Sequence, residues 1–377
     1  MISWLMCSSK KYDQVYIFLL LITLVPAQGL TQTFFTISGT VVDELTADPI
    51  AGAQIFLNGT TIGTTSTPDG RYILNGIPEG IFELVVSFIG FESANTTINT
   101  SKLSPELHFI LVEKTYQLNQ IIVKPDPKRW KQDLDLFNDY FLGTGPFSSD
   151  TKILNPEVLT FYYNDNERIF TATANDRLTI ENKALGYTIY YLLEHFELNY
   201  ATSSNSFAGR PFFVPMISRR KRVNSRWHQN RKTAYYGSFQ HFTQSLIDGK
   251  SETNGFIVRA EEQRDEKRYL TKQPLSTSSY FSQYDSTTYM LKFKNFLNVT
   301  YENEYEDPSY LLSIQSVFDS HPRQLVQYQN SIVTIVQDSI LIDKSGYIHN
   351  PLAIYCGGYW GFEKISDLLP LEYTVTE

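Results

Sequence analysis

Residues 37–91 read ISGTVVDELTADPIAGAQIFLNGTTIGTTSTPDGRYILNGIPEGIFELVVSFIGF, and short runs of alternating apolar and polar residues fill this stretch. Strand-breaking residues separate the runs at Pro49, at Asn58-Gly59, at Pro68-Asp69-Gly70 and at Pro78-Glu79-Gly80. Gly and Asn tolerate positive φ and Pro fixes φ, so such clusters end strands and form turns. Strands at this spacing predict a small antiparallel β-sandwich.

The last run of this stretch, residues 81–91, shows which side chains should be buried. Successive side chains of a strand point to opposite faces. One face is therefore expected to carry Phe82, Leu84, Val86 and Phe88. The sequence ELHFILVEKTYQLNQIIV at residues 106–123 is expected to supply the last strands of the sandwich.

Several short motifs in this region carry a family resemblance. They are GTVVD at 39–43, PIAGA at 49–53, TPDGRY at 67–72, GIPEG at 76–80 and IGF at 89–91. Together they resemble the carboxypeptidase regulatory-like domain, a transthyretin-like seven-stranded β-sandwich. The following LNQIIV at 118–123 resembles the segment that trails this domain in outer-membrane TonB-dependent receptors of Bacteroidetes-type bacteria. The resemblance implies a structural or interaction module without catalytic residues of its own.

Peptidase chemistry is not expected. A zinc carboxypeptidase needs a His-x-x-Glu pair and a distant His to hold the metal. No histidine of the chain has Glu three residues later, and no HExxH motif occurs. The histidines are His108, His195, His228, His241, His321 and His349. We therefore expect no catalytic residues, no metal site and no cofactor.

The amino terminus predicts export. Lys10 and Lys11 precede the apolar run at 15–25, and Val25-Pro26-Ala27 offers small residues for cleavage before Gln28. Residues 1–27 are thus interpreted as a signal peptide, with an uncleaved anchor as the alternative. The run is shorter than the roughly 20 residues of a membrane span. The protein is expected in the periplasm, at the outer membrane or on the cell surface, peripheral to the membrane rather than spanning it.

Composition then divides the remaining chain. The β-sandwich is assigned to residues 28–124, a linker rich in Lys, Asp and Pro to 125–132, and an α+β domain with a predominantly antiparallel sheet to 133–377. After cleavage about 350 residues remain, too few for a receptor barrel of 22 strands with its loops.

The second domain begins with an expected helix. Leu134, Phe137 and Phe141 recur at helical spacing, and Gly143 can end that helix. Residues 158–163 and 168–173 are expected to form a hairpin, and 186–198 a long strand.

Residues 198–247 contain eight basic residues and no acidic one, although the whole chain has a formal net charge of −8. The basic residues are Arg210, Arg219, Arg220, Lys221, Arg222, Arg226, Arg231 and Lys232. Such charge separation can steer an anionic partner, with an attraction that salt weakens. An envelope protein or an anionic glycan or lipid is favoured over nucleic acid, which an exported protein would rarely meet. The alternative is a solvated helix face, or internal pairing with acids such as Glu261, Glu262 and Asp265.

Within this segment, Trp227, Arg231 and Tyr235 lie four residues apart and should share one helix face. Gly237 can end that helix, and Ser238 can cap a second helix whose Phe239, Phe242 and Leu246 face a core. The candidate binding residues are Arg219, Arg220, Arg222, Arg226, Trp227, Arg231 and His241.

A second resemblance rests on NPEVLTF at 155–161, IENKALGY at 180–187 and the Trp227-to-Phe242 pattern. It points to uncharacterised Bacteroidetes carboxypeptidase-regulatory-like proteins and covers residues 130–255. Whether the ending GYWGFEKISDLLPLEY at 358–373 belongs to it stays open. The resemblance implies a domain plan and no activity.

Three functions follow as hypotheses. The first is a non-enzymatic envelope protein that mediates binding or assembly, and the second is a carbohydrate or lipopolysaccharide binder. The third is a hydrolase using Ser238, His241 and Arg231, with Glu194 beside His195. Against the third, Ser238 is better explained as a helix cap and His241 as a hydrogen-bonded helix residue, while Glu194 and His195 should lie on opposite strand faces.

Overall fold

The computed structural model describes residues 33–102, 106–114, 127–264, 267–318 and 327–375. The expected signal peptide at 1–27, the trailing segment at 118–123 and residues 125–126 of the expected linker lie outside these ranges.

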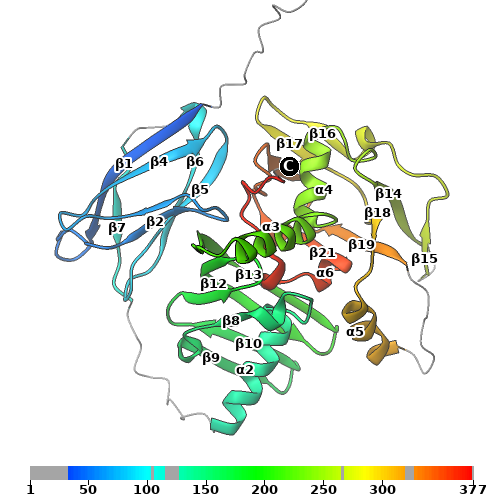
Figure 1. Ribbon diagram of the computed structural model, residues 1–377, viewed down its shortest axis with the longest axis horizontal. Helices are drawn as coiled ribbons and strands as arrows, with labels where there is room; N and C mark the ends of the chain where they lie inside the picture. The colour runs from blue at the N-terminus through cyan, green and yellow to red at the C-terminus, as the bar shows by residue number, and fades with distance from the viewer. Residues whose placement is uncertain (1–32, 103–105, 115–126, 265–266, 319–326, 376–377) are drawn as a thin grey trace, which may run out of the picture. The chain divides into compact units, whose positions relative to one another are not determined.

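Seven strands form the amino-terminal β-sandwich, which confirms the predicted fold (Figure 1). They are β1 (Phe34–Asp43), β2 (Gln54–Leu57), β3 (Gly63–Thr65), β4 (Arg71–Pro78), β5 (Ile81–Ser87), β6 (Ala94–Asn99) and β7 (Phe109–Leu111). One sheet has the order β4-β1-β7 and the other β3-β2-β5-β6. Only the β1–β7 pair among these described strands is parallel.

The predicted turns and alternation shape this sandwich. Gly70 has a φ of +72°, and a Cβ there would lie 2.7 Å from the carbonyl oxygen of Val41, so this turn requires glycine. On β5, Phe82, Leu84 and Val86 are buried in the sandwich core as expected. Phe88, just beyond the strand, is only partly buried.

A six-stranded antiparallel sheet follows the sandwich. It contains β8 (Thr151–Ile153), β9 (Leu159–Asn164), β10 (Ile169–Ala174), β11 (Leu178–Asn182), β12 (Tyr187–Asn199) and β13 (Ser204–Pro215). The order is β8-β11-β12-β10-β9, with β13 also paired to β12. The pairing of β9 with β10 and the length of β12 confirm the expected hairpin and long strand.

Helix α2 (Pro127–Phe141) packs on this sheet through Phe137 and Phe141, whose rings contact Phe161, Phe196 and Tyr191 (Figure 1). Residues 127–132 of the expected linker are thus helical and form the start of α2. Proline is compatible with the first turn of a helix, where its missing N–H has no intrahelical acceptor.

The rest of the second region builds a separate core. A five-stranded sheet has the order β15-β14-β18-β19-β21, and a three-stranded sheet the order β16-β17-β20. The strands are β14 (Phe256–Arg264), β15 (Lys267–Leu270), β16 (Phe281–Gln283), β17 (Thr288–Leu291), β18 (Phe296–Tyr305), β19 (Tyr328–Ile335), β20 (Ile340–Asp343) and β21 (Ile354–Gly358). The helices after β13 are α3 (Lys221–Tyr235), α4 (Phe239–Ile247), α5 (Pro308–Phe318) and α6 (Tyr359–Phe362). Phe242 and Leu246 of α4 join this core as expected. Helix α3 contributes Ala234 and Tyr235 to the core of the six-stranded sheet instead.

The sandwich and the six-stranded sheet share a further apolar contact. Phe56 and Val85 point out of the sandwich and pack with Phe212 of β13, with ring centroids of the two phenylalanines 5.1 Å apart. Gly63 lies close to the same ring, where a Cβ would approach it to 2.5 Å. Strand β5 is thus buried on both faces in this region.

The segment that follows α6 connects several of these parts. The side chain of Asn182 donates to the carbonyl of Ser366 (2.8 Å), and the side chain of Gln240 donates to that of Pro370 (2.9 Å). The backbone N–H of Leu371 donates to the carbonyl of Gly59 in the sandwich (2.8 Å). Residues 366–371 therefore contact the sandwich, the six-stranded sheet and α4.

Candidate functional site

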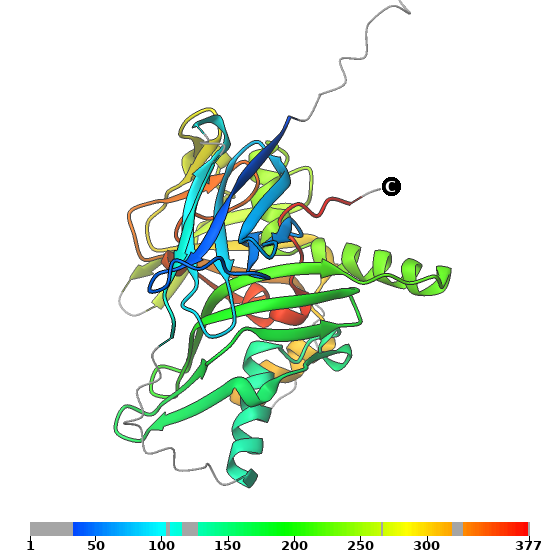
Figure 2. The same ribbon diagram turned by 90° about the vertical axis from the view of Figure 1, so that its left-hand side faces the viewer.

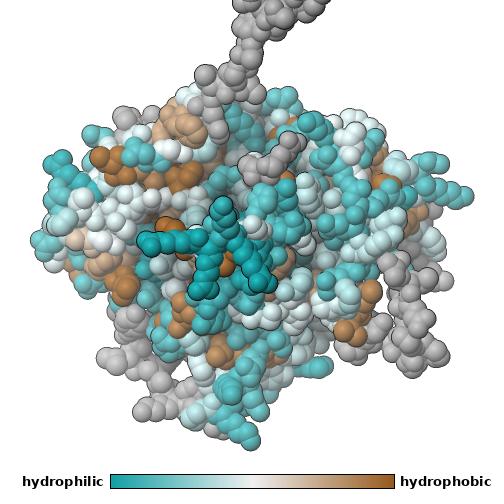
Figure 3. All heavy atoms as spheres, in the orientation of Figure 1, coloured by the Kyte–Doolittle hydropathy of each residue, from teal (hydrophilic) through white to brown (hydrophobic). Residues whose placement is uncertain are grey.

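The basic residues at the start of α3 form an exposed cluster. Arg219, Arg220, Lys221 and Arg222 are all exposed, and we call these four residues the basic tip. Figure 2 shows the green helix α3 projecting from the strands that precede it, and Figure 3 shows hydrophilic side chains gathered over it. Within the described parts of the chain, no carboxylate forms an ion pair with any of the four.

The helix start makes this cluster electrostatically unfavourable. Arg220 occupies the N-cap position without a side-chain cap hydrogen bond, and the first turn of α3 contains no acidic residue. The amino end of a helix carries a partial positive charge that favours anions and disfavours cations. An anion placed here would relieve this repulsion.

Three other candidate residues attach α3 to the turn at 183–186. Trp227 donates from its indole N–H to the carbonyl of Lys183 (2.9 Å), and Arg226 donates to the same oxygen (3.3 Å). Arg231 donates to the carbonyls of Leu185 (2.7 Å) and Gly186 (3.2 Å). Trp227 and Arg231 thus serve architecture, and the structure does not place them beside the basic tip as ligands for an anion.

His241 lies in the second core. Its side chain is 5% exposed, and Nδ1 accepts a hydrogen bond from the Gly237 N–H (3.2 Å). Burial lowers its pKa to about 4, so the ring is neutral at pH 7. Ser238 caps α4 by accepting the N–H of His241 (3.1 Å), which confirms the structural interpretation of both residues.

The remaining groups of the hydrolase hypothesis are also engaged elsewhere. His195 shares a hydrogen bond with Ser206 (2.9 Å), whereas Glu194 pairs with Arg210. Arg210 also pairs with Glu83 of the sandwich through Nε (2.8 Å). The structure therefore does not assemble Ser238, His241 and Glu194 into one polar site.

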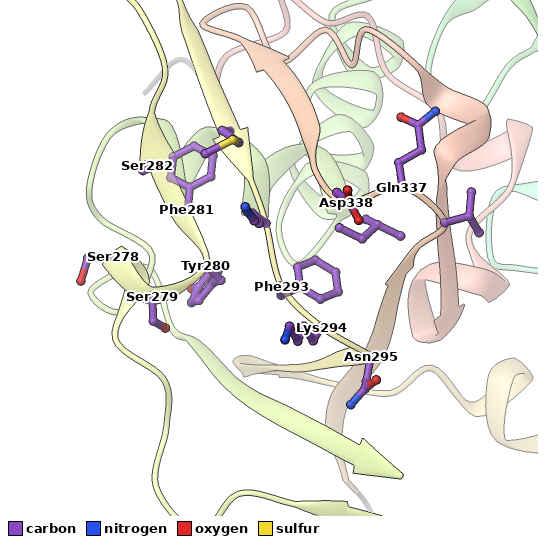
Figure 4. Close-up of a pocket in the computed structure, with 14 residues that line it drawn as sticks. Ser278, Ser279, Tyr280, Phe281, Ser282, Phe293, Lys294, Asn295, Gln337 and Asp338 are labelled. Atoms are coloured by element: carbon purple, nitrogen blue, oxygen red, sulfur yellow. The ribbon is translucent and has the colours of Figure 1, made fainter.

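A groove that the sequence did not indicate lies beside β16, with a volume of about 910 Å³. Figure 4 shows Phe293 between the Ser278–Tyr280 segment and the Gln337–Asp338 turn. Part of the lining is apolar, from Tyr280, Phe281, Met290, Ile335 and Val336. The other lining side chains carry hydroxyl, amide or charged groups: Ser278, Ser279, Ser282, Lys292, Lys294, Asn295, Gln337 and Asp338. These groups come from three separate segments of the chain, 278–282, 292–295 and 337–338, so no local sequence pattern brings them together.

In the described ranges, no three His, Cys, Asp or Glu side chains lie close enough to hold a metal ion. None of the described helices is long and apolar enough to cross a bilayer.

The amino-terminal sandwich matches a known protein family. Residues 37–123 match the model of the CarboxypepD_reg-like domain, which confirms the resemblance expected from the motifs. The TonB-dependent receptor SusC of Bacteroides thetaiotaomicron is 31% identical to this chain over 88 residues. That match covers 23% of this chain and only 8% of the receptor. Both findings fit an envelope-associated β-sandwich module of Bacteroidetes type.

Solved structures give weaker similarities. A 3-chlorocatechol 1,2-dioxygenase from Rhodococcus opacus has a TM-score of 0.19 at 12% identity, covering 22% of this chain and 61% of the dioxygenase. A putative carbohydrate binding protein from Bacteroides uniformis has a TM-score of 0.17 at 10% identity, covering 47% of this chain and 78% of that protein. Scores this low carry no argument about the function of this chain.

Proposed function

We propose that this chain is an exported, non-catalytic protein of the bacterial envelope that docks an acidic envelope protein on the basic tip. The observation that carries the proposal is the exposure of four adjacent cations without a carboxylate partner in the described residues. The CarboxypepD_reg-like sandwich supports a role in binding or assembly rather than in chemistry.

The charges of the basic tip favour an acidic partner for a physical reason. The four cations repel one another, and the positive amino end of the α3 dipole repels them as well. Carboxylates that approach the basic tip reduce both repulsions. Because the cluster is exposed, association should weaken steeply with salt. An anionic glycan or lipid would offer the same charge, and the test below distinguishes it from a protein.

The test is cross-linking in cells from a photoreactive residue placed at Ser225, followed by mass spectrometry. Ser225 is exposed and one turn from the tip. The triple variant Arg219→Gln, Arg220→Gln and Arg222→Gln should lose the captured envelope protein. The matched control carries Lys131→Gln, Lys250→Gln and Lys272→Gln, three exposed lysines elsewhere with the same change in net charge. The control should retain capture.

Three outcomes would contradict the proposal. Equal capture by the wild type and the tip variant would show that the tip does not contact the partner. Equal loss in both variants would assign the effect to net charge alone. Capture of lipid or glycan adducts without a protein would replace the protein partner with an envelope polymer.

A second candidate function, carbohydrate binding, is favoured by the groove beside β16. Phe293 is partly exposed there and offers an apolar face, while the surrounding hydroxyl and amide groups can hydrogen-bond sugar hydroxyls. Titration with envelope oligosaccharides tests this role. Phe293→Ala should abolish binding, whereas Tyr162→Ala, at an exposed aromatic outside the groove, should leave it unchanged. The absence of binding by the wild type would exclude the groove as a glycan site for those sugars.

A further inference from the structure

A second cavity, of about 400 Å³, lies between β13, α4 and the segment after α6. Its walls are mostly apolar, and they include Phe207, Phe239, Ile348, Leu352, Trp360 and Leu368. This volume lies within the range of roughly 300–1,000 Å³ that is typical of small-molecule sites. Leu352 is 55% exposed although it lines the cavity, so it marks an opening to solvent.

Three charged residues, Glu363, Lys364 and Asp367, reach this cavity from one short segment. Burial raises the pKa of Glu363 well above its usual value, and the negative charge of Asp367 raises it further. Burial also lowers the pKa of Lys364 to about 8 and raises that of Asp367 to about 6. All three residues are partly buried, and all three line the cavity.

Several polar groups around the cavity already have partners within the protein. The side chain of Gln240 donates to two backbone carbonyls, and that of Thr243 donates to the carbonyl of Gln240. The indole N–H of Trp360 donates to the carbonyl of Gly237 (2.6 Å). Asp367 accepts from the backbone N–H of Lys364 (3.1 Å) and the hydroxyl of Ser366 (2.9 Å).

Lys364 and Glu363 differ from these groups. The ammonium of Lys364 lies over the ring of Phe207, 5.5 Å from its centroid. The negative charge of Asp367 acts to raise the pKa of Lys364, but within the described residues no carboxylate forms a direct ion pair with this ammonium. The carboxyl of Glu363 makes no side-chain hydrogen bond within the same residues. Burying an ammonium without a direct ion-pair partner costs free energy, which a bound anion would reduce.

We propose that this cavity binds a single-chain amphiphile whose anionic oxygen head group, a carboxylate or a phosphate, pairs with Lys364 and whose apolar chain lies along the walls toward Leu352. Burial raises the pKa of Glu363, and when its carboxyl is protonated it adds a hydrogen-bond donor for the same head group. The ammonium disfavours a cationic head group, and the apolar walls offer too few hydrogen bonds for a sugar. The site is separate from the basic tip and from the groove beside β16.

Calorimetric titration of the purified protein with four probes tests the head group. The probes are dodecanoate, dodecyl phosphate, dodecanol and dodecyltrimethylammonium, each below its micelle concentration. At least one anionic probe should bind with a stoichiometry of one and at least tenfold more tightly than the neutral and cationic probes. Comparison of the two anions identifies the head group. Equal binding of all four probes, preference for the cation, or no binding would overturn the proposal.

Two variants test the location. Lys364→Met should weaken binding of the anionic probe about ten- to hundredfold, the loss expected for one charge-assisted hydrogen bond. Lys292→Met, at an exposed lysine in the other groove, should leave it unchanged. Ala208→Phe should fill the cavity and abolish binding while circular dichroism shows an intact fold. Unchanged binding by Ala208→Phe would place the site elsewhere, and the comparison of probes on the wild type holds even if a variant fails to fold.

Discussion

Arg231 uses its guanidinium group to hydrogen-bond backbone carbonyls of the protein itself. Its guanidinium donates to two carbonyls of the 185–186 turn and lies over the ring of Tyr187, 4.1 Å from the centroid. A planar guanidinium group can hydrogen-bond and stack on an aromatic ring at the same time, and it does so better than the ammonium group of lysine. The residue therefore stabilises the contact between α3 and the turn before β12.

Replacement of Arg231 by Ala should reduce the free energy of unfolding by about 2–3 kcal/mol, because two carbonyls lose donors and one cation–π contact is lost. Urea denaturation measures this change. Arg222→Ala, at an exposed position of the basic tip, should change stability by less than about 0.5 kcal/mol. Similar losses in both variants would contradict the structural role of Arg231.

His241 should make stability depend on pH. Its pKa is about 4 in the folded protein, below the ordinary value of 6.5, so the unfolded state binds the proton more readily. Stability should be unaffected above pH 6.5 and should fall as the pH drops toward 4, by up to about 3 kcal/mol. Urea denaturation from pH 4 to 7.5 measures this contribution as the difference between the wild type and His241→Asn. A constant difference across that range would show that the proton is not excluded from His241.

Some of these residue roles could be predicted and others could not. The Ser238 cap and the end of a helix at Gly237 follow from local rules, because both partners lie within a few residues. The sequence offers Trp227 and Arg231 as candidate binding residues on one helix face; in the structure they donate to carbonyls 44 to 46 positions away in the chain. No periodic pattern in the sequence indicates which distant carbonyl will accept a hydrogen bond from these side chains.

Helix α4 depends on its cap for a defined start. Ser238 Oγ accepts the N–H of His241 and donates to the carbonyl of Tyr235 (2.7 Å), so it links the end of α3 to the start of α4. Since α4 carries Phe242 and Leu246 into the second core, a loosened start would affect packing beyond the helix itself.

Ser238→Ala should lower stability by about 1–2 kcal/mol, the usual cost of losing an N-cap side chain. Thermal denaturation monitored by circular dichroism measures the loss. Ser238→Thr keeps the hydroxyl and should recover most of the stability. If Thr is no better than Ala, the cap hydrogen bond is not the reason for the effect.

The joint between the sandwich and the six-stranded sheet is a feature of the assembled chain. Phe56, Val85 and Phe212 form its apolar part, and Arg210 between Glu83 and Glu194 forms its charged part. Two backbone hydrogen bonds, from Gly59 N–H to Pro211 O (2.8 Å) and from Phe213 N–H to Thr60 O (2.9 Å), align residues 59–60 of the sandwich with β13. The sandwich is therefore fixed to the region that follows it.

Phe212→Ala should destabilise the protein by about 3–5 kcal/mol, as expected for removing a buried aromatic ring. Chemical denaturation measures the effect, and limited proteolysis should cut the variant faster between the sandwich and the sheet. Phe34→Ala, at a position 58% exposed, should stay within about 0.5 kcal/mol of the wild type. Equal stability of both variants would mean that the joint contributes little.

The sequence predicts those parts of the fold that depend on residues close together in the chain. Turns at Gly70 and alternation along β5 predict the sandwich, and the β9–β10 hairpin follows from its flanking strands. The core side of α4 is predicted, but no local pattern predicts the pairing of β18 with β14 and β19, which come from distant segments. Burial of Val85 was missed for the same reason, since its partner Phe212 belongs to another sheet.

The contacts of residues 366–371 have a consequence for the order of folding. These residues follow every described strand in the chain, yet they bond to Gly59, to Asn182 and to Gln240. Until residues 366–371 join the fold, the earlier segments lack these hydrogen bonds, and the cavity between β13 and α4 lacks a wall. The apolar side chains that line this cavity would stay exposed during that interval, in which a chaperone could protect them from aggregation.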